Sequence, residues 1–131
     1  MSKQKLGFSK TLSLDYESAI PKVTEELKKE GFGVLTEIDV TDTLKKKLGV
    51  DFKKYKILGA CNPTLAHKAL SMETEIGLFM PCNVIVYENE KGQTVVTALD
   101  PLVALSQIQN EQLTPIAKEA AQKLQRVINA L

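Results

Sequence analysis

A short turn late in the chain limits the possible folds more than any other feature. The turn, Asn89-Glu90-Lys91-Gly92, separates a strand pattern at 78–88, interrupted by Pro81, from another at 93–99. Two strands joined by so short a connection pair antiparallel, as a hairpin. The earlier strand and helix patterns alternate, which alone would favour a parallel sheet, so the hairpin indicates a mixed sheet instead.

The periodicity of apolar residues and the positions of capping residues predict the remaining elements. Asp15 or Ser13 caps the first helix, and Asn62 caps a helix whose first residue is Pro63. Pro21, inside the first helix pattern, predicts either a bend or a start nearer Ser18. In chain order we expect strand 6–12, a helix ended by Gly31, strand 32–40, a short helix 42–48 closed by Gly49, strand 55–60, helix 63–72, the hairpin, a short helical or irregular stretch from Asp100, and helix 114–131.

The strand pattern at 32–40 contains two alternating sets of side chains. One set is Val34, Thr36, Ile38 and Val40, and the other is Leu35, Glu37 and Asp39. Alternate residues of a strand point to opposite faces. We expect the first set to face the core.

These elements predict a single α+β domain over residues 1–131, a two-layer sandwich. Its mixed, mostly antiparallel sheet carries helices packed on one face. A chain of 131 residues removes roughly two-thirds of its unfolded surface from water, which is enough for one core. A sheet covered on one side leaves its other face to be hidden, and self-association is a common solution. We therefore expect a homodimer.

Charge and cysteine content exclude several classes of function. A net charge of +1 with 44% apolar and 25% charged residues predicts no general attraction to nucleic acid or to an anionic membrane. Six lysines and one aspartate between Lys45 and Lys56 are more typical of a solvated surface than of a nucleic-acid site.

Two cysteines are too few for a disulfide-stabilised secreted fold, and the amino terminus lacks the apolar core of a signal peptide. No apolar stretch approaches the roughly 20 residues of a membrane span. We expect a cytoplasmic protein with reduced thiols.

Both thiols and the only histidine lie in two short segments, Gly59–His67 and Pro81–Asn83. Cys61 comes just before the expected helix cap, where unpaired N–H groups and the helix dipole favour a thiolate, which could be reactive or bind a soft metal. The alternative is a small apolar residue buried at a strand end. His67 lies too far into the helix to be a good base for Cys61. The spacing C-x5-H-x14-C of Cys61, His67 and Cys82 matches no common zinc motif, although such ligands suit Zn²⁺ or Cu(I).

The relative direction of the two cysteine-bearing strands decides whether the thiols can share a site. If the strands are antiparallel neighbours, the end of one adjoins the start of the other, and a thiol pair is possible. If a helical crossover makes them parallel, the cysteines lie at opposite ends of the sheet.

Polar residues near these segments are further candidates. Glu37 and Asp39 are two apart on a strand, a spacing that could hold water or substrate between carboxylates, although Asp39 could instead cap the next helix. Asn62 and Asn83 each follow a cysteine and could hold a polar ligand, with helix capping the better-supported role for Asn62.

Several of these segments together resemble a bacterial and archaeal family catalogued as domain of unknown function 302. The matching blocks, which cover most of the chain from Gly31 to Pro101, are Gly31–Asp39, Tyr55–Pro63, Leu78–Val84 and Asp100-Pro101. The resemblance implies a compact two-layer α+β fold, similar to half of the TATA-binding-protein topology, assembled as a dimer, and it implies no established activity. The family's motif positions include Glu37, Cys61, Asn62, Cys82 and Asn83, whereas His67 is more variable.

Three hypotheses follow. The first is a cytoplasmic, dimeric binding domain whose pocket, lined by Glu37, Cys61, Asn62, Cys82 and Asn83, holds a small molecule or a soft metal ion. The second is a thiol-dependent enzyme or redox protein in which Cys61 reacts and Cys82 resolves. The third is a structural or interaction module with both cysteines buried.

Overall fold

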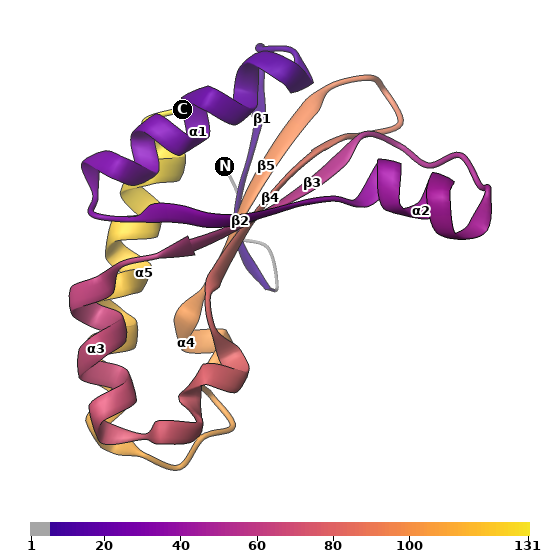
Figure 1. Cartoon of the computed structure of the whole chain (residues 1–131). Helices are drawn as coiled ribbons and strands as arrows, with labels where there is room; N and C mark the ends of the chain where they lie inside the picture. Colours follow the sequence, from indigo (N-terminus) through magenta and orange to yellow (C-terminus); the bar gives the residue numbers. More distant parts are fainter. Residues whose placement is uncertain (1–5) are drawn as a thin grey trace.

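Five strands form one antiparallel sheet. The structure, a computed structural model, describes residues 6–131. Its elements are β1 (Gly7–Leu12), α1 (Tyr16–Lys29), β2 (Gly33–Asp39), α2 (Val40–Leu48), β3 (Tyr55–Cys61), α3 (Pro63–Met72), the 3₁₀ helix η1 (Thr74–Phe79), β4 (Cys82–Glu88), β5 (Thr94–Leu99), α4 (Pro101–Ala104), the 3₁₀ helix η2 (Glu111–Leu113) and α5 (Thr114–Asn129). The strand order is β1-β5-β4-β3-β2, and each neighbouring pair is antiparallel. The predicted α+β class is confirmed (Figure 1).

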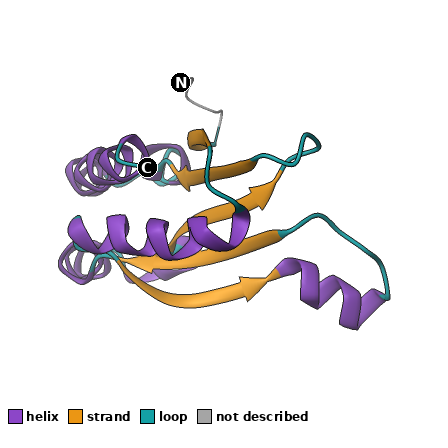
Figure 2. Cartoon of the chain, turned by 90° about the horizontal axis from the view of Figure 1, so that it is seen from above, coloured by secondary structure: helices purple, strands orange, loops and turns teal. Residues whose placement is uncertain are grey.

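Helices α1 and α5 form the second layer, on one side of the sheet (Figures 1 and 2). The core between the layers contains Phe8, Leu58, Val84, Val86 and Val96 from the strands and Val23, Leu27, Leu124, Val127 and Ile128 from the helices, all of them buried. The apolar stripe of α5 therefore covers the sheet. None of the described helices is long and apolar enough to cross a membrane.

The side chains that alternate with the core residues form the other side of the sheet, which we call the open face. One row of it crosses all five strands: Ser9, Thr97, Ile85, Ile57 and Ile38 are successive partners in the pairing register. No helix among the described residues forms a second layer over this face (Figure 1).

The prediction of which β2 residues face the core is wrong after Val34. Val34 pairs with Ala60 and Thr36 with Gly59, so Leu35 is an extra residue, a β-bulge. Val34 packs against the core, but beyond the bulge the alternation is reversed, and Ile38 is 49% exposed. A single inserted residue moves every later side chain to the opposite face.

The capping predictions are confirmed. Asp15 caps α1 by accepting a hydrogen bond from the Ser18 N–H, and α1 begins at Tyr16 with Pro21 inside it. Asn62 caps α3, whose first residue is Pro63, and Gly49 ends α2 in the left-handed conformation at φ 68°. Short-range side-chain chemistry therefore fixes these boundaries.

A second, smaller apolar cluster lies beyond the end of the sheet. Ala69 of α3, Ile76 of η1 and Leu113 of η2 are its buried members, and Met80 and Ile116 pack against them. The segment predicted as the beginning of a strand at 78 belongs partly to η1, and β4 starts only at Cys82, after Pro81. Proline has no N–H group to donate to a strand ladder, which explains the later start.

Gly59 lets the sheet close tightly beside this cluster. A Cβ atom there would lie 2.2 Å from Thr36 Oγ1 and 2.9 Å from Pro81 Cγ. We expect Gly59→Ala to lower the free energy of unfolding by about 1–3 kcal/mol, because neither the β-branched threonine nor the proline ring can move away freely. Urea unfolding measures this.

Gly33→Ala is the matched control, since nothing lies within 4 Å of the added atom and φ at Gly33 is not positive. It should be neutral or slightly stabilising. Adding Thr36→Ala to Gly59→Ala should recover part of the lost free energy of unfolding. Equal losses for Gly59→Ala and Gly33→Ala would show that the close approach of Thr36 and Pro81 to Gly59 does not affect stability.

Candidate functional site

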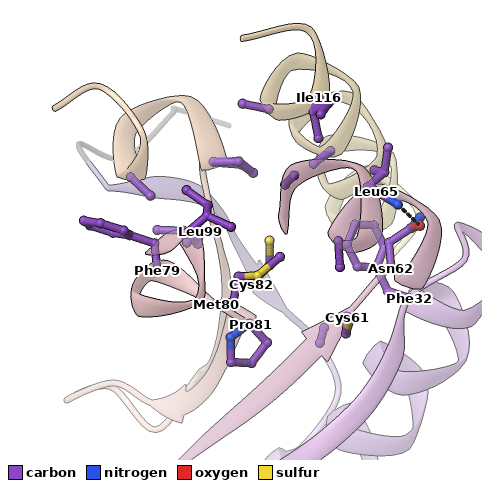
Figure 3. Close-up of a pocket in the computed structure, with 18 of the residues that line it drawn as sticks. Phe32, Cys61, Asn62, Leu65, Phe79, Met80, Pro81, Cys82, Leu99 and Ile116 are labelled. Carbon is purple, nitrogen blue, oxygen red and sulfur yellow. Dashed lines mark hydrogen bonds between the residues drawn. The ribbon is translucent and has the colours of Figure 1, made fainter. Parts of the chain in front are cut away.

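An apolar cavity lies where β3, β4 and β5 end. It has a volume of about 340 Å³ and is enclosed by these strand ends together with α3, η1, α4 and the first half of α5. Figure 3 shows two walls, with Phe79 and Leu99 on one side and Leu65 and Ile116 on the other. A volume in this range is typical of small-molecule sites.

The walls of the cavity are almost entirely aliphatic or aromatic. Thr36, Asn62 and the two cysteines are the polar side chains in the lining, and no Asp, Glu, Lys, Arg or His of the described chain contributes to it. Burying an unpaired charge or polar group in such surroundings is costly. The cavity therefore suits an uncharged, apolar ligand.

Cys82 is the polar group most closely associated with the cavity. It opens β4 and is half-buried against the core, and Figure 3 shows its sulfur directed between the two walls. Burial raises the pKa of the Cys82 thiol to about 11, with a smaller contribution from the nearby Cys61. At neutral pH Cys82 is a neutral thiol, which is compatible with an apolar lining.

Cys61 is close to Cys82 but is not directed at it. The two strands are antiparallel neighbours, as one of the two predicted arrangements required, and Cys82 pairs with Ala60, the residue before Cys61. Successive strand residues point to opposite faces, so the two thiols leave the sheet on opposite sides. Both cysteines are free, and a disulfide would need the backbone to move, because its Cβ atoms must face each other at about 3.8 Å.

Asn62 lies at the cavity but its amide is already engaged. Its Oδ1 accepts the Leu65 N–H at 3.2 Å, and its Nδ2 donates to the Glu30 carbonyl at 3.4 Å. The side chain thus connects the start of α3 to the turn before β2, where Gly31 has a φ of 86°. Its role is to position the cavity wall.

Three of the predicted site residues lie away from the cavity lining. Glu37 is exposed on β2 and pairs with Lys56 at 3.5 Å. Asn83 is exposed and pairs with Gly59 on β3, and His67 is exposed on α3. Among the described residues, no three His, Cys, Asp or Glu side chains come together in a possible metal site.

The residues that give the cavity its apolar character have no signal in the sequence that marks them as a site. Leu65, Ala69 and Leu70 form a helical stripe on α3, and Ile76 continues it into η1. This spacing marks a buried helix face, but it carries no chemical signature that distinguishes a cavity wall from an ordinary core. Cys61, Asn62 and Cys82 lie at the same end of the sheet as the cavity, but the sequence marked them as candidates for thiol, metal or polar-ligand chemistry.

Four of the six lysines between 45 and 56 form ion pairs. Lys45 pairs with Asp51, Lys46 with Asp42, Lys54 with Glu17 and Lys56 with Glu37. Each pair neutralises positive charge that a nucleic acid would need. The arrangement agrees with the expectation of a solvated surface.

Comparison with known proteins adds a family and a similar fold. The family model described as "Domain of unknown function DUF302" matches residues 8–131. Among solved structures, the crystal structure of an uncharacterized conserved DUF302 protein from Bacillus stearothermophilus is similar, with 30% sequence identity and a TM-score of 0.89 over 96% of this chain and 98% of the other. The search of curated proteins gave no match.

The raised pKa of Cys82 predicts slow alkylation. In the native protein we expect the rate of Cys82 modification by iodoacetamide to rise with a midpoint near pH 11, because only the thiolate reacts and burial disfavours it. Mass spectrometry resolves Cys82 from Cys61, and the urea-unfolded protein supplies the reference midpoint. A pH midpoint for Cys82 alkylation in the native protein at or below that of the unfolded protein would contradict burial of the Cys82 thiol.

The same shift predicts a loss of stability at alkaline pH. Between the ordinary thiol value of 9.0 and the folded value of about 11, the unfolded chain releases the proton and the folded chain keeps it. Stability therefore falls as pH rises through this window, by about 2–3 kcal/mol in total. The Cys82→Ala variant should lack this pH-dependent loss of unfolding free energy. Burial also raises the pKa of Tyr16 to about 12, but Tyr16 is present in both proteins, so its contribution cancels when their unfolding free energies are subtracted at each pH.

Proposed function

The chain belongs to the family described as domain of unknown function DUF302, and from its cavity we propose that it binds an uncharged, apolar small molecule at the end of β3, β4 and β5. The supporting observation is a volume of about 340 Å³ whose lining contains no charged side chain among the described residues. Sites of this size usually combine apolar walls with a few polar groups that orient the ligand.

The polar groups at the cavity favour a ligand with few hydrogen-bonding demands. Asn62 uses one N–H group and one oxygen lone pair of its amide within the protein, which leaves one donor and one acceptor position for a ligand. The Cys82 thiol is a weak donor and a polarizable contact. A long-chain alcohol or a comparable hydrocarbon fits this chemistry better than a carboxylic acid, since ionised carboxylates are costly to bury.

The cavity has an apolar entrance. Leu35, Leu70 and Phe79 belong to its lining and are also exposed, with Leu35 at 68%. They come from the β2 bulge, α3 and η1, so three separate elements meet at the rim. An apolar ligand would meet matching side chains before it reaches the interior.

A soft metal at the cysteines has weaker support. The two thiols leave the sheet on opposite sides, and His67, the third candidate ligand, is exposed on α3. Thiol chemistry with Cys82 as the resolving residue meets the same geometric obstacle. A purely structural role for the cysteines leaves the cavity itself unexplained.

We also propose that the protein is a homodimer in the cytoplasm. The open face carries Ile57, Ile85 and Tyr87 without a second layer among the described elements, and covering such a face on association is favourable. The two free cysteines are compatible with a reducing compartment.

Ligand binding is tested with the fluorescent probe N-phenyl-1-naphthylamine. Ala66 lines the cavity on α3, so Ala66→Phe should fill part of it and weaken probe binding by about tenfold or more, the effect of roughly 1.4 kcal/mol of lost contact. His67→Phe is the matched control, because the neighbouring residue on the same helix is exposed and not part of the lining. Decanol should displace the probe better than decanoate.

Ala104→Phe, on the opposite wall, serves as a second variant if Ala66→Phe unfolds the protein. Thermal unfolding shows whether each variant is folded. No probe binding by the unmodified protein, or equal binding by the Ala66, Ala104 and His67 variants, would rule out the cavity as the site.

A further inference from the structure

We propose that the projecting arm of residues 40–52, formed by α2 and the loop after it, docks on a second copy of this chain together with the open face. This inference rests on the homodimer proposed above and assigns its contact surfaces. Figures 1 and 2 show α2 extending past the end of the sheet, away from α1 and α5. The arm therefore lies outside the two-layer body of its own chain.

Helix α2 has an apolar stripe whose last member, Leu48, is exposed, whereas Val40 and Leu44 are half-buried. Val40, Leu44 and Leu48 are spaced by four residues and share one side of the helix. The helix contains no buried residue, and Leu48 is 69% exposed. Phe52, at the end of the arm, is exposed as well.

The arm is held to its own chain mainly by polar contacts. A nine-residue helix is below the length of about 12–15 residues at which isolated helices become even marginally stable in water. The Thr41 hydroxyl accepts the Tyr55 N–H and donates to the Lys53 carbonyl, and caps at Asp39 and Gly49 close the two ends of the helix. The ion pairs of Lys46 with Asp42 and of Lys45 with Asp51 are exposed and contribute little. Burial of Leu48 against another molecule would add apolar contact that these interactions lack.

The open face is suited to contact with a copy of itself. Its strand positions carry no Asp, Glu, Lys or Arg in the described sheet. Apart from glycines, and from Cys61 and Leu99 at the cavity, they are Ser9, Thr11, Thr36, Ile38, Tyr55, Ile57, Asn83, Ile85, Tyr87, Val95 and Thr97, of which Ser9 and Val95 are buried within the chain. In a two-fold dimer the same patch meets itself, so like charges would repel across it. An uncharged, partly apolar face avoids this repulsion.

The area of the open face indicates why the arm is needed. Strands about 4.8 Å apart with about 3.4 Å per residue make a five-stranded face of about 480 Å², whereas a stable interface takes about 800 Å² from each partner. A nine-residue helix about 14 Å long and 10 Å wide adds about 140 Å² on its own chain. Face and arm together reach about 620 Å² from each partner, which is at the lower end of the range of about 600–1,000 Å² per partner for specific interfaces.

The test measures dimerisation by analytical ultracentrifugation over a wide range of concentrations. Leu48→Lys in the arm and Ile38→Lys on the open face should each raise the dimer dissociation constant by about tenfold or more, because a lysine would be desolvated twice in a two-fold interface. Leu14→Lys is the matched control, an exposed leucine in the turn before α1 and outside both surfaces. Circular dichroism confirms that each variant is folded.

Hydrogen exchange tests the arm separately from the face. Ile38→Lys leaves the arm sequence intact, yet exchange of the amides in Val40–Leu48 should become faster as the dimer dissociates. A monomer at all concentrations would overturn both the homodimer and this inference. A dimer that is unaffected by Leu48→Lys and Ile38→Lys, or whose α2 amides exchange equally in both states, would overturn the inference and leave the homodimer standing.

Discussion

The antiparallel pairing of β3 with β4 determines where the rest of the molecule can lie. Because Ala60 pairs with Cys82, β3 ends and β4 begins at the same edge of the sheet. The chain between them, α3 and η1, therefore stays beyond that edge and has no strand to pack against. It packs instead on α5 and on the short segment around Leu113. The second apolar cluster and the cavity beside it are consequences of this one pairing.

The same arrangement explains the roles of the motif residues at this end of the sheet. Gly59 allows Thr36 and Pro81 to approach β3 within the distance that a Cβ atom would occupy. Asn62 joins α3 to the turn before β2 through the Glu30 carbonyl. Burial among the apolar side chains at the strand ends raises the pKa of the Cys82 thiol. Gly59 and Asn62 shape this end of the sheet, and the Cys82 thiol stays neutral there.

Local signals in the sequence were sufficient for the elements but not for the site. Asp15, Asn62-Pro63 and Gly49 act within a few residues of their own position, so their effects could be predicted from the sequence. The bulge at Leu35 depends on how β2 meets β3, which no local pattern records, and it reversed the predicted faces of the strand. Glu37, Asn83 and His67 were chosen as candidates for their chemistry, yet none lines the cavity. The walls come from residues such as Leu65, Phe79 and Ile116, which are far apart in sequence and individually ordinary.

The cavity at the strand ends connects the proposed ligand with the stability of the fold. Its rim includes the exposed side chains of Leu35 and Phe79, and water against apolar walls lacks hydrogen-bond partners. An apolar ligand of the kind proposed would replace such water and bury its own apolar surface, which is favourable by about 25 cal/mol per Å². Because this ligand would bind only the folded chain, the same free energy would stabilise the fold. Ligand affinity and fold stability would then rise together.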